Sequence, residues 1–148
     1  MPIHWVWKSF NELTAPECYG MLQLRNQVFV VEQQCIFQDA DNKDQVSYHH
    51  MGWDGGRLVA YARVVPAGIS YPEISIGRVT TNPHFRNKGI GRELMIRSIA
   101  MIHKEFGYQS IKIGAQLYLQ KFYESLGFER SSDIYVEDGI QHIEMMLK

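Results

Sequence analysis

Between a predicted strand and a predicted helix, the chain reads Arg86-Asn87-Lys88-Gly89-Ile90-Gly91. Two glycines at such a junction let the backbone approach a ligand closely. The first N–H groups of a helix have no partner within the helix and lie at the positive end of its dipole, which suits a phosphate. Arg86 and Lys88 add cationic donors. These residue types fit a phosphate-binding loop and, equally well, an ordinary turn with solvated basic side chains.

Two familiar phosphate-binding patterns are excluded. The Walker pattern needs Gly, four residues and then Gly-Lys-Ser/Thr, and the chain contains no such run. The dinucleotide fingerprint needs a third small residue where Leu94 stands.

The elements on either side of the loop are clearly marked. From Ile90 to Phe106, apolar residues recur with the helical period, and Gly107 is a typical helix end. Residues 74–81 before the loop have the composition of a strand. Pro83 ends that strand because proline removes a donor and restricts Asn82.

The rest of the chain alternates strand and helix signals without a linker, a repeat or a low-complexity tract. Thr14 and Glu17 form a capping box that starts a helix ending near Val31, and Asp54-Gly55-Gly56 predicts a hairpin turn. We expect strands over 4–10, 46–53, 57–65, 74–81, 110–115, 128–136 and 141–147, and helices over 15–31, 90–106 and 117–126. A mixed sheet covered by helices follows, as a single α/β or α+β domain over residues 1–148.

Composition narrows the classes of function. The chain has 148 residues, 45% hydrophobic and 21% charged, with 15 Lys plus Arg against 16 Asp plus Glu. This balance argues against a general nucleic-acid or membrane-surface binder. No window approaches the ~18 apolar residues of a membrane span, and the first ten residues lack a signal-peptide pattern, so we expect a cytoplasmic protein. Cys18 and Cys35 are too few for a zinc site or a disulfide framework and are expected to be free thiols.

Three segments carry a family resemblance. The loop, with Arg86, Gly89 and Gly91 after Thr81-Asn82-Pro83, resembles the acetyl-CoA motif of the GNAT superfamily of N-acetyltransferases. The run Phe122-Tyr123-Glu124-Ser125-Leu126-Gly127-Phe128 is similar to that family's Tyr-x-x-Leu-Gly-Phe helix end. Residues 24–33, followed by Cys35 and a group of aspartates, are similar to the ElaA-type branch. The order of elements also matches over essentially the whole chain.

The resemblance implies a fold and a place for acetyl-CoA. The sheet would be mixed and mostly antiparallel, with residues 74–81 and 110–115 splayed apart at their carboxyl ends. The pantetheine arm would enter the gap and pair with the first of these strands. The pyrophosphate would rest on the glycine loop. Gln116 stands where many members have Asn, which makes a contact there less secure. The expected cofactor-binding residues are Val79, Thr80, Thr81, Arg86, Asn87, Lys88, Gly89, Ile90, Gly91 and Gln116, with no metal.

In such a reaction an amine attacks the thioester, and the leaving thiolate needs a proton. Tyr123 suits the role of general acid, because a phenol with an ordinary pKa of about 10 keeps its proton at neutral pH and can still donate it. Without the motif, Tyr123 would be an aromatic residue that packs at a helix end. Tyr118 faces elsewhere on the helix and is the weaker candidate. A backbone N–H between Val79 and Thr81 is a candidate donor to the oxyanion.

The base that deprotonates the amine stays open. Glu32, Asp41, His49 and His50 are candidates, although each is more often a solvated or satisfied polar residue. Glu32 is slightly favoured, as a base or a substrate contact, because it closes the apolar run of the first predicted helix. A water chain is the alternative to a single base.

Two further features could serve the acceptor. Arg25 could bind a substrate carboxylate or pair with a neighbouring acid. The acidic residues 39–44 could attract a cationic amine or form a solvated loop. They do not match an EF-hand, because Asp44 and His50 stand where Gly and Glu are required.

Two hypotheses follow. The first is an acetyl-CoA-dependent N-acetyltransferase that acts on a primary amine of a small molecule or peptide by direct attack in a ternary complex. The alternative is a non-catalytic module that binds or senses acyl-CoA. No nucleic-acid or membrane partner is expected. A homodimer is possible through Met145, Met146 and the edge strands.

Overall fold

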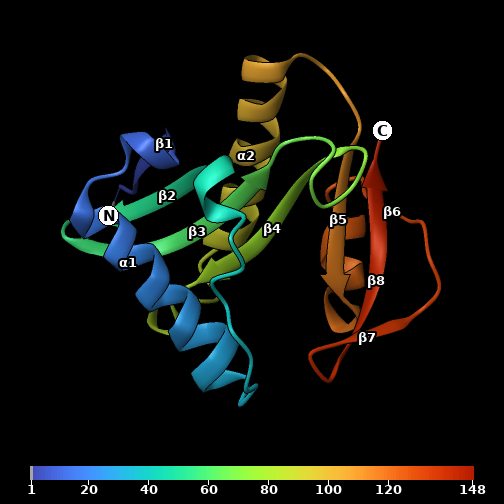
Figure 1. Ribbon diagram of the computed structural model, residues 1–148, viewed down its shortest axis with the longest axis horizontal. Helices are drawn as coiled ribbons and strands as arrows, with labels where there is room; N and C mark the ends of the chain where they lie inside the picture. The colour runs from blue at the N-terminus through green and yellow to red at the C-terminus, as the bar shows by residue number, and fades with distance from the viewer. Residues whose placement is uncertain (1) are drawn as a thin grey trace.

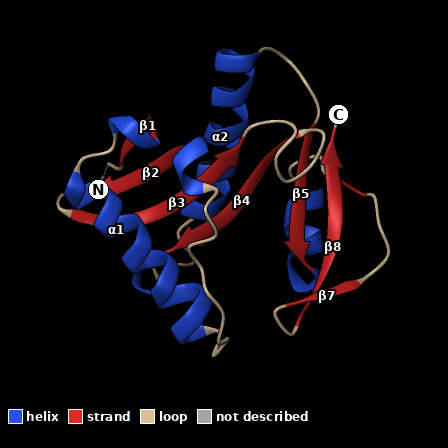
Figure 2. Ribbon diagram, in the orientation of Figure 1, coloured by secondary structure: helices blue, strands red, loops and turns tan. Residues whose placement is uncertain are grey.

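The computed structural model describes residues 2–148 and shows one mixed sheet with helices on both faces (Figures 1 and 2). The sheet order is β1-β2-β3-β4-β5-β8-β6, and β7 also pairs with β8. All neighbouring strands are antiparallel except β4 and β5, which are parallel. The strands are β1 (His4–Ser9), β2 (Tyr48–Asp54), β3 (Arg57–Val65), β4 (Ile74–Thr81), β5 (Ile111–Gln116), β6 (Glu129–Arg130), β7 (Tyr135–Glu137) and β8 (Ile140–Leu147), and the α-helices are α1 (Ala15–Arg25), α2 (Ile90–Phe106) and α3 (Gln120–Glu124).

The order of elements confirms the predicted fold class. The capping box also forms, with the Glu17 N–H donating to Thr14 Oγ1 at 3.2 Å and the Thr14 N–H donating to Glu17 Oε1 at 2.9 Å. Helix α1 is shorter than predicted, because the chain changes at Asn26 to a π-helix that runs to Glu32. The helix predicted over 117–126 is a 3₁₀ turn at Leu117–Leu119 followed by α3.

The single strand predicted over 128–136 is wrong. Two short strands, β6 and β7, pair with different parts of β8 and are separated by residues 131–134. At this break, the Ser132 hydroxyl accepts the Glu144 N–H at 2.8 Å, and the Ser131 N–H donates to the Glu144 carbonyl at 2.8 Å. A side-chain hydroxyl thus takes the place of a backbone partner, and the strand is interrupted.

Alternation along β3 divides the core into two clusters. Ala60, Ala62 and Val64 face α2, and Tyr61 faces α1 on the other side of the sheet. Leu94 belongs to the apolar face predicted for α2, and it is fully buried. Burying a side chain of this kind contributes about 1.5–3 kcal/mol. Both faces of the centre of the sheet are therefore covered, and its strands are held in fixed positions.

The parallel strands β4 and β5 pair only at their beginnings. The register joins Ile74 to Ile111 and Ser75 to Lys112, and no later residue of β4 pairs with β5 within residues 2–148. β4 then continues to Thr81 and β5 to Gln116, and Figure 1 shows the two ribbons separating. The predicted splay of the central strands is confirmed.

Among residues 2–148, no helix is long and apolar enough to cross a membrane.

Candidate active site

Strand β4, which borders the gap on its β5 side, carries a β-bulge in its ladder with β3. Tyr61 of β3 is opposite Thr80 of β4, and Arg63 of β3 is opposite Gly77 of β4. Two residues of β4, Arg78 and Val79, therefore face the single residue of β3 that lies between Tyr61 and Arg63. Arg78 has a left-handed φ of 51°. A bulge locally disrupts the ladder and re-aims the backbone of its strand. The bulge lies on the stretch of β4 that, among residues 2–148, has no partner on its β5 side.

The loop of residues 86–91 follows the end of β4 and opens α2. Gly89 caps the helix with a φ of 75°, and Asn87 also has a positive φ of 65°. A Cβ atom on Gly89 would meet no atom within 4 Å, so the backbone is open to an approaching group. Lys88 and Asn87 are exposed beside it. The helix start, the two positive-φ residues and the unpaired edge of β4 therefore adjoin one another.

Two of the predicted site residues form an ion pair with each other. Arg86 donates to both carboxylate oxygens of Glu32, at 2.6 and 2.7 Å, and Arg86 also donates to the Thr81 carbonyl at 3.3 Å. The hydrogen bonds from Arg86 hold the pKa of Glu32 below its ordinary value. A lowered pKa makes a carboxylate a weaker base. The geometry thus disfavours Glu32 as the base and connects the end of the π-helix to the glycine loop.

Tyr123 lies on α3 in an apolar environment. It is 6% exposed and packs edge-on against Phe122 and Phe128, with ring centroids 5.1 and 6.0 Å away. Burial, with a smaller effect from nearby Tyr118, raises the pKa of the Tyr123 phenol above its ordinary value. Tyr123 therefore keeps its proton at neutral pH. Tyr118 is 74% exposed.

Gln116 meets the segment that follows the π-helix. Its amide exchanges hydrogen bonds of 3.3 and 3.4 Å with Gln33, across 83 residues of chain. Two residues further on, the Cys35 thiol donates to the Asp138 carbonyl at the turn between β7 and β8, at 3.0 Å. We call residues 32–35 the bridging segment, because Glu32, Gln33 and Cys35 contact three different elements around the splayed strands. Cys35 and Cys18 are both free thiols.

The acidic residues 39–44 are neither a solvated loop nor a free amine-binding group. Asp39 and Asp44 accept from the buried guanidinium of Arg25, each at 2.7 Å. Arg63 binds Asp41 at 2.7 and 2.9 Å and Asp44 at 3.0 Å. Arg78, from the bulge, binds Asp39 at 2.8 Å. We call these six side chains the arginine–aspartate network.

The other predicted candidates, Arg25, His49 and His50, are buried and have partners within the protein. Arg25 is 0% exposed and satisfied by two aspartates, so the alternative of a neighbouring acid is correct. His49 is buried between the Tyr61 hydroxyl at 2.6 Å and the Asp44 carbonyl at 2.9 Å. His50 is buried beside Ser98, and burial lowers its pKa to about 4. Neither histidine is available as a base for a substrate.

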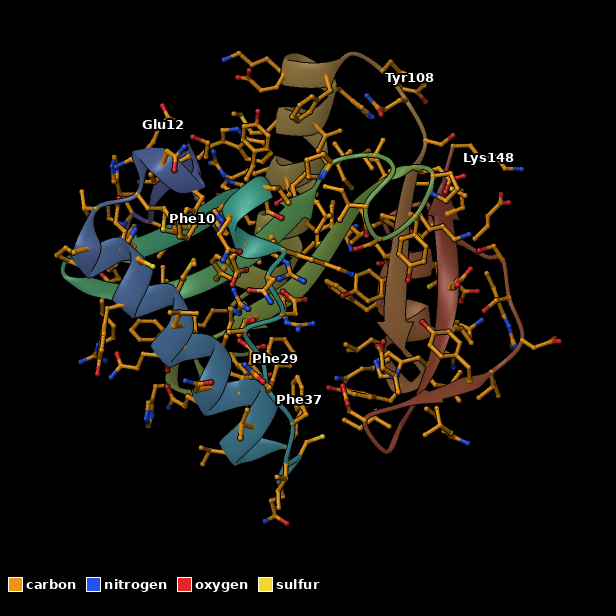
Figure 3. The ribbon with its side chains drawn as sticks, viewed as in Figure 1. Phe10, Glu12, Phe29, Phe37, Tyr108 and Lys148 are labelled. Carbon is orange, nitrogen blue, oxygen red and sulfur yellow. The ribbon has the colours of Figure 1, made fainter. Side chains whose placement is uncertain are left out.

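Three contacts around the candidate site were missed from the sequence. Arg63 stands inside a buried strand and Arg78 inside the strand at the gap, and a charge at such a position signals a buried partner. The Gln33–Gln116 pair has no sequence signal, because its members are far apart in the chain. Figure 3 adds Phe37, which lies near the gap, 5.9 Å from the Arg78 guanidinium.

No group of metal-binding side chains was found among residues 2–148. The parallel pair is splayed, is open along one edge and is followed by a glycine at a helix start. This geometry suits an extended, phosphate-bearing ligand. The fold is that of an acyl-CoA N-acyltransferase.

Comparison with known proteins identifies the family. Residues 18–148 match the acetyltransferase (GNAT) domain, and the chain belongs to that family. Protein ElaA of Escherichia coli is 38% identical over 97% of this chain and 95% of its own length, which supports the ElaA-type branch. The structure of Escherichia coli ElaA has a TM-score of 0.93 at 36% identity, over 99% of this chain and 100% of that one. An acyl-CoA N-acyltransferase from Pseudomonas aeruginosa has a TM-score of 0.95, also at 36% identity and with the same coverage. Family and fold together support acyl transfer from an acyl-CoA.

Proposed function

We propose that the chain is an N-acetyltransferase that moves the acetyl group of acetyl-CoA to a primary amine by direct attack, in a ternary complex. The observation that supports this proposal best is the joint position of the β4 edge, the Gly89 helix start and the buried phenol of Tyr123. Membership of the GNAT family supports the acyl transfer, and the acetyl donor and the amine acceptor are the proposed refinement.

The residues present fit acetyl-CoA. The missing Cβ of Gly89 leaves the helix start open, so that backbone N–H groups from Asn87 to Gly91 would hold the pyrophosphate. Lys88 would add positive charge, and Arg86 would do so after leaving Glu32. The free edge of β4 at Val79, Thr80 and Thr81 would accept the pantetheine arm, with Gln116 at the far side of the gap.

The bound acetyl-CoA would supply an activated thioester carbonyl. A backbone N–H between Val79 and Thr81 would donate to the developing oxyanion. Tyr123 would give its proton to the departing sulfur, and its raised pKa means that this proton is present when it is needed. The acceptor is a small-molecule or peptide amine, and we propose that the protein acts in the cytoplasm without a nucleic-acid or membrane partner. Met145 lies fully in the core, so a homodimer would have to use other residues.

A binding assay followed by a thiol-release assay tests the proposal. We expect acetyl-CoA, and not ATP, to raise the melting temperature. A ligand at ~100 times its dissociation constant adds about 2.7 kcal/mol of stability. We then expect release of free thiol when a panel of primary amines is added. Stabilisation by acetyl-CoA without thiol release would favour the non-catalytic acyl-CoA-binding module. The absence of any stabilisation would contradict both functions.

A further inference from the structure

His142 lies on β8 directly opposite Gln116, the last residue of β5. Side chains alternate along a strand, so His142 shares one face with Glu144 and, across the ladder, with Gly114 and Gln116. On the opposite face, Ile143 belongs to the core cluster that also contains Tyr123. His142 therefore stands beyond the point where β4 and β5 separate, on the other side of the sheet from Tyr123.

The tautomer of His142 is set by its own strand. Nδ1 lies 2.7 Å from the Ile140 carbonyl oxygen. A carbonyl only accepts, so Nδ1 carries the hydrogen and the neutral ring presents a lone pair at Nε2. Tyr135 stacks on the ring, with centroids 5.7 Å apart and planes 24° apart, and holds its orientation. This arrangement leaves Nε2 as the nitrogen that can accept a proton.

His142 is 8% exposed, and its nearest charged group does not hydrogen-bond to Nε2. Glu137 Oε2 lies 3.8 Å from Nε2, and within residues 2–148 no hydrogen bond to Nε2 is formed. The other charged and titratable groups on this face are Tyr135 of β7, Glu144 of β8, Lys112 of β5, which pairs with Glu144 at 3.0 Å, and Tyr71 of the β3–β4 loop. Glu137 is thus the carboxylate neighbour of the ring.

Two tyrosine hydroxyls approach β5 at Gly114, on the face that carries His142. A Cβ atom on Gly114 would lie 2.9 Å from the Tyr71 hydroxyl and 3.0 Å from the Tyr135 hydroxyl, so glycine alone lets both phenols reach this part of the strand. In the bridging segment, Gln33 contacts the same face of the sheet, and Cys35 contacts the β7–β8 turn. His142 is thus the imidazole with a free nitrogen among several polar groups that converge at the end of β5.

We propose that His142 is the general base that deprotonates the acceptor amine, an assignment that rests on the proposed function. Nε2 takes one proton from the substrate ammonium, R–NH₃⁺, and releases it to solvent. The free amine forms the N–C bond to the acetyl carbon while the C–S bond breaks. The sulfur takes the Tyr123 proton, and the second amine proton restores Tyr123. The balance is R–NH₃⁺ plus acetyl-CoA giving the acetamide, coenzyme A thiol and H⁺.

His142→Asn is the sharpest variant, because its amide can still donate to the Ile140 carbonyl and cannot take a proton. With a primary alkylamine, which is an ammonium ion at neutral pH, as the nucleophile, we expect thiol release to fall about 100-fold or more, since positioned proton transfer contributes roughly 10²–10⁴-fold. Stabilisation by acetyl-CoA should remain that of the unmodified protein. Added imidazole should restore part of the lost rate. His103→Asn, at the far end of α2, is the matched control and should behave like the unmodified protein.

A second measurement does not depend on activity. Nitrogen-15 NMR of the imidazoles in the free protein should show His142 with its hydrogen on Nδ1, and the signal should vanish in His142→Asn. A hydrogen on Nε2, a loss of rate that imidazole does not restore, or a near-normal rate in His142→Asn would each overturn the assignment. Failure of the proposed function looks different, because the unmodified protein would then bind no acetyl-CoA or release no thiol with any nucleophile.

Discussion

At the scale of single residues, Tyr123 combines deep burial with a hydroxyl that the proposed chemistry uses. Tyr123→Phe removes only the oxygen and leaves the contacts with Phe122 and Phe128 in place. We expect turnover to fall about 100-fold or more and acetyl-CoA affinity to stay unchanged, because the hydroxyl acts on the departing sulfur. Thiol release under conditions where chemistry limits the rate measures this effect. Tyr118→Phe, at an exposed position, is the control, and unchanged turnover in Tyr123→Phe would contradict the acid role.

Gly89 makes a second prediction at this scale. Gly89→Glu places bulk and negative charge where the pyrophosphate is expected, so it should abolish stabilisation by acetyl-CoA. Because Gly89 has a φ of 75°, any side chain there also costs about 1 kcal/mol of folding free energy. Gly55→Glu is matched, with a φ of 60° and nothing within 4 Å of the new Cβ. Melting temperatures with and without acetyl-CoA separate the two effects. A Gly89→Glu protein that keeps the ligand shift would show that the phosphates bind elsewhere.

At the scale of elements, the arginine–aspartate network ties α1 and the loop after it to β3 and the bulge of β4. Although burial acts to raise the pKa values of Asp41 and Asp44, their hydrogen bonds to Arg63 and Arg25 hold these pKa values below the ordinary range. The network thus positions the edge that we assign to the ligand. The acidic residues of the network were predicted as a surface feature, because the acidic run is visible in the sequence. That three arginines fold onto this run is not visible there.

The network predicts how stability depends on pH. The folded pKa values of Asp41 and Asp44 lie below the unfolded value of about 3.9. Their contribution is therefore complete above that value and is lost as the pH falls through the lowered folded values. Urea unfolding from neutral pH to about pH 3 should show the beginning of this loss. Asp44→Asn should cost about 3–5 kcal/mol at neutral pH, because it breaks a buried ion pair.

The matched control for Asp44→Asn is Asp133→Asn at an exposed position, which should stay within about 0.5 kcal/mol of the unmodified protein. An equal, small effect of both variants at neutral pH would show that the network contributes no stability.

The ion pair between the bridging segment and the glycine loop makes a further prediction. If Arg86 holds the ligand's phosphate, Glu32 competes for it. Glu32→Gln should then tighten acetyl-CoA binding by the worth of an exposed ion pair, about 0.2–1 kcal/mol, or up to about fivefold in dissociation constant. Calorimetry measures it, with Glu129→Gln on β6 as the control. Weaker binding by Glu32→Gln would mean that Glu32 supports the site instead.

At the scale of the whole molecule, the sequence predicted what depends on local pattern and missed what depends on distant pairing. The loop at Gly89, α2 and the splay of β4 and β5 followed from motif and resemblance. The interruption between β6 and β7 did not, because it depends on Ser132 capping a backbone group of β8. The contact of Gln33 with Gln116 depends on the fold as a whole, since it joins the amino-terminal half of the chain to the carboxyl-terminal half.

Within residues 2–148, the two parts of the sheet meet only at Ile74–Ile111 and Ser75–Lys112. This division predicts which backbone amides a bound ligand will protect from exchange. An unpaired strand edge opens more easily than a paired one. We therefore expect acetyl-CoA to slow amide hydrogen exchange along β4 after Ser75 and in the first turn of α2. Exchange in the β1–β2 pair, which is complete from His4 to Ser9, should not change. Hydrogen exchange followed by mass spectrometry measures both regions in one experiment, and uniform protection across the whole sheet would contradict binding in the gap.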